Sequence, residues 1–297
     1  MWHARCRGRT SAVNADLHTH TARSDGLLAP AELVRQAAAA GLACLALTDH
    51  DSLAGIAEAT AAAQAIGLRL VPGVELSVRD SQRNEEHLLG FFIDPASPDL
   101  QRYLHTLQDA RRQMAEQTLH TLHQLGLPLS AERVAELAAG AVVTRPHIAR
   151  AMVEAGYVSD EREAFDRYLG SGRPAAPERP SPSPSEAIAT IRAAGGVAGL
   201  AHPVFPQDAG AAERQASLPA RLDSLIEAGL QAIECFYPDA PAELRAELAQ
   251  LAQRRGLLAT GGTDYHGPGK APYAELGQVS VDTTVVADLE RLSRHHP

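Results

Sequence analysis

Cysteine and aromatic residues are scarce in this sequence. Among its 297 residues there are three cysteines, and aromatic side chains make up 4%. Cys6, Cys44 and Cys235 lie far apart and form no CxxC pair, which excludes a disulfide scaffold and a thiolate zinc finger. The core must therefore be built from Ala, Leu, Val and Ile, and we expect a reduced, cytoplasmic protein.

Long apolar runs and an excess of positive charge are also missing. No apolar run approaches the roughly 18 residues that a membrane-spanning helix needs, and no apolar segment follows the arginines near the start, so we expect no signal peptide. The net charge of −9 disfavours binding of long nucleic acid, because that binding depends on clustered cations. A local phosphate pocket remains compatible with this charge. Hydrophobic residues at 45% exclude wholesale disorder.

Short β-type runs alternate with helical segments rich in Ala and Leu, a pattern typical of βα units around a parallel sheet or barrel. The polar turn at 79–86 joins two of the runs and predicts a hairpin. Strands are expected over 13–18, 44–48, 69–78, 88–93, 197–201, 232–236 and 257–260. Helices are expected over 30–40, 53–66, 185–194, 220–228 and 242–255. The fold class is therefore predicted to be α/β.

One long segment interrupts this alternation. The helical periodicity over 100–125 is followed by shorter helical patterns and by no convincing strand until residue 186. We interpret 95–185 as a helical insertion in a discontinuous barrel domain that covers 14–94 and 186–290. The ends, 1–13 and 291–297, are expected to be flexible tails.

Six histidines and several carboxylates lie at the ends of the predicted strands. The loops at the carboxyl ends of the strands in such folds converge on one site. Imidazole and carboxylate together suit Zn²⁺, Mn²⁺ and Fe²⁺. A single histidine on a strand is more often a hydrogen-bonded core residue, but that explanation weakens with each member of the set. These residues are His18, His20, Asp25, His50, Glu75, His87, His202, Asp264 and His266.

Six short motifs occur in one order along the chain: Asp16-Leu17-His18-Thr19-His20, Ser24-Asp25-Gly26, Thr48-Asp49-His50-Asp51, Gly73-Val74-Glu75, Ala201-His202-Pro203 and Thr263-Asp264-Tyr265-His266. Together they resemble the PHP (polymerase and histidinol phosphatase) superfamily. The resemblance implies a distorted (β/α)₇ barrel with a phosphoesterase site that holds two or three metal ions. The insertion carries Thr144-Arg145-Pro146-His147 and Tyr168-Leu169-Gly170. With these motifs the chain is most similar to the branch with a helical insertion, which includes 3′,5′-nucleoside bisphosphate phosphatases and 5′-to-3′ exoribonucleases.

The resemblance also implies how the metal ligands are shared. The first ion would be held by His18, His20, Glu75 and Asp264. The second would be held by Asp25, His50 and His266, and the third by Glu75, His87 and His202. Mn²⁺ is expected, with Zn²⁺, Fe²⁺ or Mg²⁺ as alternatives. A metal-bound hydroxide at the site of Asp25, His50 and His266 would attack phosphorus. Asp49 is expected to orient a histidine, with a turn-forming role as the alternative.

Substrate choice is expected to lie in the insertion. Arg145 and His147 stand at the start of a predicted helix, where an anion is favoured, and would bind a second phosphate. Arg173 is a further candidate, and the alternative for each is an ordinary surface or turn residue. We therefore expect hydrolysis of the 3′-phosphate of 3′,5′-nucleoside bisphosphates and trimming of short 5′-phosphorylated RNA. The alternatives are a histidinol-phosphate phosphatase and a non-catalytic, metal-stabilised module.

Overall fold

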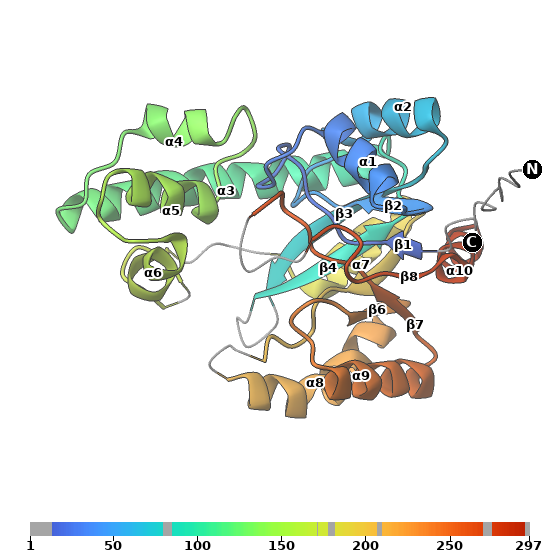
Figure 1. Cartoon of the computed structure of the whole chain (residues 1–297). Helices are drawn as coiled ribbons and strands as arrows, with labels where there is room; N and C mark the ends of the chain where they lie inside the picture. Colours follow the sequence, from blue (N-terminus) through green and yellow to red (C-terminus); the bar gives the residue numbers. More distant parts are fainter. Residues whose placement is uncertain are drawn as a thin grey trace, which may run out of the picture.

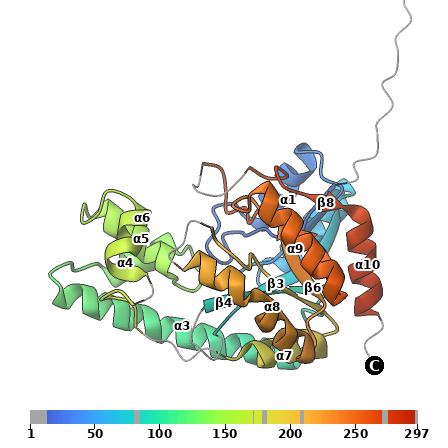
Figure 2. The ribbon, with the colours of Figure 1, turned by 90° about the horizontal axis from the view of Figure 1, so that it is seen from below.

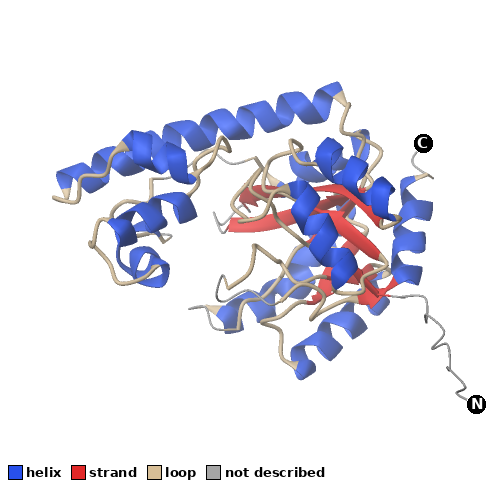
Figure 3. Ribbon diagram, turned by 45° about the horizontal axis from the view of Figure 1, so that its top comes forward, coloured by secondary structure: helices blue, strands red, loops and turns tan. Residues whose placement is uncertain are grey.

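The structure is a computed structural model and describes residues 14–79, 85–170, 172–177, 182–206, 210–269 and 275–294. Its centre is one eight-stranded sheet that curls into a nearly closed barrel, seen in red in Figure 3. The strand order is β7-β6-β5-β4-β3-β2-β1-β8. The strands are β1 (Asn14–Asp16), β2 (Cys44–Leu47), β3 (Arg69–Arg79), β4 (Glu85–Phe91), β5 (Val197–Leu200), β6 (Ala232–Phe236), β7 (Leu258–Gly261) and β8 (Val281–Asp282).

Strand directions explain the distortion of the barrel. Parallel pairing links β1 to β2 and β2 to β3, and again β5 to β6 and β6 to β7, whereas β4 is antiparallel to both of its neighbours. The sheet closes where the Leu17 N–H donates to the Gly261 carbonyl at 3.2 Å and the His20 N–H donates to Tyr265 at 2.8 Å. The expected α/β barrel and its β3–β4 hairpin are confirmed. The eighth strand, β8, was not predicted; it adds antiparallel to β1.

Helices cover the outside of the barrel. In Figure 1, α1 and α2 lie on one side of the sheet and α8 and α9 on the opposite side. Left-handed glycines end α2 and α9, as expected for residues without a Cβ. These helices are α1 (Pro30–Ala39), α2 (Ile56–Ile66), α7 (Pro184–Ala193), α8 (Ala211–Glu227), α9 (Ala242–Arg255) and α10 (Thr283–Ser293).

Two of these helices correct the sequence-based boundaries. Helix α8 begins at Ala211, nine residues before the expected start, and it contains Pro219 in its interior. Helix α10 was not predicted, and it continues to Ser293. The expected tail at 291–297 is therefore too long, since Val286 and Leu289 of α10 are buried against the barrel. Residues 1–13 and 295–297 lie outside the described residues.

The insertion consists of α3 (Pro98–Gln124), α4 (Ala131–Leu137), α5 (Arg145–Glu154), α6 (Glu161–Ala164) and the π-helical turn η1 (Phe165–Leu169). Figure 2 shows α3 running from the barrel out to the smaller helices. Its first half contributes Leu100, Leu104 and Leu107 to the barrel core, and its second half contributes Ala115 and Leu122 to a separate core. Helix α3 thus belongs to both units and holds the insertion beside the mouth of the barrel.

Candidate metal centre

The barrel brings all nine predicted ligand residues to one end. The β1 strand leads into His18 and His20, the segment after β2 carries His50, and β3 and β4 carry Glu75 and His87. Residues after β5 and β7 complete the set with His202, Asp264 and His266, and Asp25 follows in the loop after β1. Two candidate ligand residues, His202 (φ +20°) and Asp264 (φ +50°), have left-handed backbone conformations. Such strain in a residue other than glycine is typical of functional sites.

Glu75 lies at the centre of the cluster with a fully buried carboxylate. Its Oε2 lies 3.1 Å from Nε2 of His18 and 3.2 Å from Nε2 of His20. Its Oε1 lies 2.9 Å from Nδ1 of His87 and 3.1 Å from Nε2 of His202. One carboxylate therefore contacts imidazoles on both sides, as a ligand shared between two ions would.

Three overlapping groups of donor atoms could each hold an ion. The first group includes Oδ1 of Asp264, which lies 3.0 Å from Nε2 of His20. In the second, Oδ1 of Asp25 lies 3.3 Å from Nε2 of His266. Within each group the ligand atoms lie within 4.8 Å of one another. The groups are His18, His20, Glu75 and Asp264; His20, Asp25, His50 and His266; and His50, Glu75 and His87.

The nitrogen and oxygen atoms of the cluster are better placed to bind a metal ion than to form hydrogen bonds with one another. Buried nitrogens of His20, His50 and His87 and Oδ1 of Asp264 have no hydrogen-bond partner among the described residues. Nevertheless Nε2 of His20, Nδ1 of His50 and Nδ1 of His87 each lie within 3.3 Å of a carboxylate oxygen. Buried polar atoms are normally hydrogen-bonded, so converging lone pairs without hydrogen bonds indicate a site for a cation. The mixed imidazole and carboxylate set suits Mn²⁺, Fe²⁺ or Zn²⁺.

The shifts in pKa also indicate that the cluster favours a bound positive charge. Burial raises the pKa of Glu75, but His50, His18 and His87 outweigh burial and hold it well below its usual range. Burial lowers the pKa of His87, but Glu75 and Glu85 raise it to about 10. By contrast, burial lowers the pKa of His50 to about 3. The anionic carboxylates thus retain protons on some imidazoles, and divalent ions would replace those protons.

Asp49 has different partners from those expected. Its Oδ1 accepts from the Thr21 N–H and the Ser24 hydroxyl, and its Oδ2 accepts from the Thr21 hydroxyl, each at 2.7 Å. Among the described residues these hydrogen bonds come from a loop and not from a histidine, which agrees with the turn-forming alternative. The carboxylate instead fixes the loop between His20 and Asp25, because that loop supplies all three donors.

The insertion reaches the metal centre through two arginines. Arg111 of α3 donates from Nε to Oδ2 of Asp51 at 2.6 Å and from Nη2 to the Ser77 hydroxyl at 2.7 Å. Arg150 of α5 donates to the Asp25 carbonyl at 3.2 Å. Both contacts lie beside candidate ligands, so the insertion supports the loops after β1 and β2.

The three predicted substrate contacts lie in different environments. Arg145 donates from Nη2 to both oxygens of Glu85, at 3.0 and 2.9 Å, and Glu85 in turn lies 3.9 Å from His87. His147 is buried, and its Nδ1 lies 3.0 Å from both the N and Oγ1 of Thr144, which is a capping geometry for α5. The side chain of Arg173 is exposed. Only Arg145 is therefore placed beside the ligand cluster by a described contact.

Glu234 of β6 was missed by the sequence analysis. Its buried carboxylate lies 3.2 Å from Nδ1 of His18 and accepts from the His202 N–H at 2.8 Å. The available signal was a single charged residue inside the apolar run Ala232-Ile233-Glu234-Cys235. A charge on a buried strand normally needs a partner, and here the partners are two candidate ligand residues.

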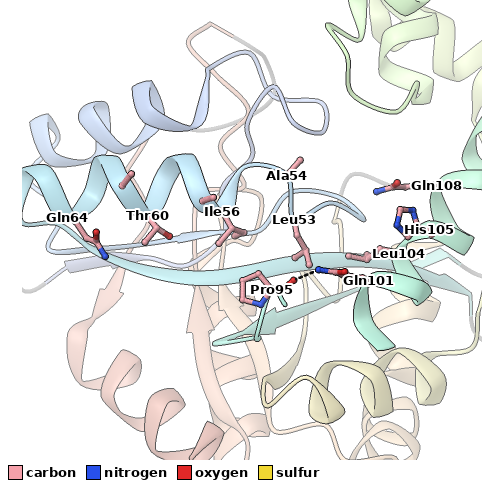
Figure 4. A pocket seen from close by; sticks show the side chains of 12 residues that line it. Leu53, Ala54, Ile56, Thr60, Gln64, Pro95, Gln101, Leu104, His105 and Gln108 are labelled. Carbon is pink, nitrogen blue, oxygen red and sulfur yellow. Dashed lines mark hydrogen bonds between the residues drawn. The ribbon is translucent and has the colours of Figure 1, made fainter. Parts of the chain in front are cut away.

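A separate groove of about 710 Å³ lies between α2 and α3 (Figure 4). Aliphatic side chains such as Leu53, Ile56 and Leu104 line it together with Gln64 and Gln101. None of the nine candidate ligands lines this groove, so its volume is distinct from the metal centre. No helix in the described ranges combines the length and apolar character needed to cross a bilayer.

The family model named PHP domain matches residues 16–165. The chain is also 37% identical over 267 residues to a 3′,5′-nucleoside bisphosphate phosphatase of Chromobacterium violaceum, covering 87% of this chain and 89% of that protein. The chain belongs to the PHP domain family. It is 36% identical over 263 residues to a 5′-3′ exoribonuclease of Haemophilus influenzae, covering 89% of this chain and 93% of that protein.

A crystal structure from Bifidobacterium adolescentis, described as a metal-dependent phosphoesterase, has the same fold. It superposes with a TM-score of 0.84 at 34% identity and covers 94% of this chain and 96% of that one. PHP phosphoesterases are metal-dependent, and this PHP protein is a phosphoric ester hydrolase with clusters that could bind metal.

Proposed function

We propose that this PHP protein hydrolyses the 3′-phosphate of 3′,5′-nucleoside bisphosphates to give nucleoside 5′-monophosphates. The same site would trim short 5′-phosphorylated oligoribonucleotides from the 5′ end, since both substrates carry a 5′-phosphate beside a scissile 3′-phosphoester. The similarity to a bisphosphate phosphatase and to a 5′-3′ exoribonuclease supports this substrate class. The net charge of −9 favours short substrates over long nucleic acid.

Two or three divalent ions, with Mn²⁺ as the expected metal, would be held by the nine clustered residues. Such ions lower the pKa of water and stabilise charge on phosphoryl oxygens. Glu75 would bridge two of the ions, because its two oxygens face different imidazoles. Asp49 would keep Asp25 in place through the loop between His20 and Asp25. The proposed ligands are His18, His20, Asp25, His50, Glu75, His87, His202, Asp264 and His266.

The observation that carries the substrate proposal is the position of Arg145. Its guanidinium projects from the start of α5 onto Glu85, and Glu85 lies beside the candidate ligand His87. Arg145 is 24% exposed, so a ligand can reach it. A 5′-phosphate would compete with the Glu85 carboxylate for this guanidinium, which is well suited to bind phosphate oxygens in pairs. A substrate anchored there would extend toward the metal centre.

The test is phosphate release with Mn²⁺ from adenosine 3′,5′-bisphosphate, with AMP and histidinol phosphate compared in parallel. We expect release from the bisphosphate while AMP stays intact. Loss of a charge-assisted hydrogen bond of about 1.5–3 kcal/mol should lower kcat/KM of Arg145→Ala by about 10- to 100-fold. Arg162→Ala is the matched control, because Arg162 also lies in the insertion but is 91% exposed. An unchanged kcat/KM in Arg145→Ala would refute the 5′-phosphate anchor.

Two alternatives give different results in the same experiment. A histidinol-phosphate phosphatase needs no second phosphate pocket, so it would prefer histidinol phosphate and would tolerate Arg145→Ala. A non-catalytic module would lose only stability on chelation, whereas the proposed enzyme would also lose activity. Release from none of the three compounds, in protein shown to hold metal, would contradict hydrolysis of small molecules and leave RNA ends to be assayed.

A further inference from the structure

Glu234 is a charged residue on a strand that is otherwise apolar and buried. Its side chain is 1% exposed, and it lies in the middle of β6. A buried carboxylate is costly unless it is paired and hydrogen-bonded. Both of its oxygens face donors: they lie 3.2 and 3.3 Å from Nδ1 of His18, and Oε2 also accepts from the His202 N–H at 2.8 Å.

The first contact determines which nitrogen of His18 can bind a metal. While Nδ1 faces Glu234, Nε2 lies 3.1 Å from Oε2 of Glu75, inside the ligand cluster. A carboxylate accepts hydrogen bonds only, so it requires the proton to be on Nδ1. The lone pair of the neutral ring is then on Nε2, directed toward the other ligands. A carboxylate behind a ligating histidine also makes that histidine a stronger base.

The second contact acts on the backbone of another candidate ligand. His202 has φ +20°, a strained conformation for a residue other than glycine. The hydrogen bond from its N–H to Glu234 holds this conformation, and its ring then lies with Nε2 3.1 Å from Oε1 of Glu75. His18 and His202 are also stacked, with ring centroids 5.6 Å apart. One carboxylate therefore positions two imidazoles that approach different oxygens of Glu75.

We propose that Glu234 is a positioning residue that sets the metal affinity of two subsites at once, through the His18 ring and the His202 backbone. The inference rests on the metal centre of the proposed function. Because the two hydrogen bonds share one side chain, Glu234 couples the subsite of His18 to the subsite of His202. A single substitution behind the centre should therefore weaken both.

The substitution Glu234→Gln tests this arrangement with almost no change of shape. An amide has one acceptor oxygen, and its NH₂ group would face either the His18 N–H or the His202 N–H. Thr260→Val is the matched control. Thr260 pairs with Glu234 in the β6–β7 register, is buried, and its hydroxyl has no hydrogen-bond partner among the described residues. That variant changes the residue paired with Glu234 without replacing a candidate ligand or removing a described hydrogen bond.

The measurement is Mn²⁺ affinity by competition with a chromophoric chelator, together with the melting temperature with and without Mn²⁺. We expect Glu234→Gln to bind Mn²⁺ about 10- to 100-fold more weakly at the affected subsites and to lose much of the metal-induced rise in melting temperature. Thr260→Val should retain both. A role in packing alone would lower both melting temperatures equally and leave the affinity within about threefold of the wild type, and that result would overturn the proposal.

A second measurement on the unsubstituted protein does not depend on the variant folding. In the Zn²⁺-loaded protein, ¹⁵N NMR should show His18 protonated at Nδ1, with His18→Asn used to assign the signal. A proton absent from Nδ1 would contradict the role of Glu234. Wild-type protein that binds Mn²⁺ but releases no phosphate would refute the proposed function and leave Glu234 testable by affinity. Wild-type protein that binds no divalent ion would refute both.

Discussion

Substitutions of Asp49 can separate its hydrogen bonds from its charge. The buried carboxylate accepts from the Thr21 N–H, the Thr21 hydroxyl and the Ser24 hydroxyl, each at 2.7 Å. Asp49→Ala removes all three acceptors. Asp49→Asn keeps an acceptor oxygen for the Thr21 N–H and the Ser24 hydroxyl, and the Thr21 hydroxyl can rotate to accept from the new amide.

The expected costs follow from these contacts. A buried donor left without a partner costs about 1–3 kcal/mol. In Asp49→Ala the Thr21 N–H loses its acceptor, and the Ser24 hydroxyl retains only longer contacts, to the Thr21 carbonyl and to Oδ1 of Asp25, each at 3.4 Å. We therefore expect Asp49→Ala to lower the free energy of unfolding by about 3 kcal/mol. Asp49→Asn should cost about 1 kcal/mol, because burial raises the pKa of Asp49 and the amide carries no buried charge.

The assay is thermal unfolding of the metal-free protein, followed by Mn²⁺ titration of each variant. At about 2–4 °C per kcal/mol for a domain of this size, Asp49→Ala should melt about 6–12 °C below the wild type and Asp49→Asn about 2–4 °C below it. Asp223→Asn is the control, since that carboxylate is exposed and pairs with Arg255. If Asp49 acted on His20 through its charge, the amide would be as damaging as alanine. Equal losses in the two variants would refute the hydrogen-bond account.

Three further predictions concern other contacts of the site. Arg111→Ala should lower the free energy of unfolding, measured in urea, by about 3–5 kcal/mol, because it removes the guanidinium that pairs with buried Asp51. A loss below about 1 kcal/mol would mean that the pair is not buried as described. Gly262→Ala should lower the free energy of unfolding by at least about 1–3 kcal/mol, since the new Cβ would clash with the backbone nitrogen of His18. Wild-type stability in urea unfolding would contradict this close approach. Burial lowers the pKa of His87, but nearby carboxylates raise it to about 10. Its contribution to metal-free stability is therefore present below about pH 6.5 and lost as the pH rises through about 10. Mn²⁺ must displace the proton on His87, so the Mn²⁺ affinity should rise with pH over this range. Calorimetry in different buffers should show proton release on binding at pH 7. An affinity that does not change with pH would contradict this prediction.

The local pattern of the chain was sufficient for the barrel and for nominating the ligand residues. Buried parallel strands are short apolar runs, and polar residues directly after them stand out, as His50 does after β2. The β3–β4 hairpin was predicted because a polar turn separates two apolar runs. Helix boundaries were less predictable. Pro219 is typical of a first helical turn, yet the structure accommodates it within α8, where burial of Leu218 and Leu222 contributes packing on both sides of it.

Contacts between segments far apart in the sequence decided the rest. Glu234 lies 216 positions from His18 along the chain, and no local pattern could pair them. Asp49 could be expected either to orient a histidine or to form a turn, and only the fold shows that its carboxylate accepts from Thr21 and Ser24. Arg145 meets Glu85 across 60 positions.

The sequence by itself therefore determined the α/β alternation, the helical insertion and the types of donor at the strand ends, because these depend on local periodicity and on the residues that directly follow each strand. The tertiary structure alone decided which oxygen faces which imidazole, how α3 joins the insertion to the barrel core, and which buried carboxylate lies behind His18. These depend on contacts between segments far apart in the sequence, such as the closure of the sheet that brings residues 17–20 beside residues 261–265.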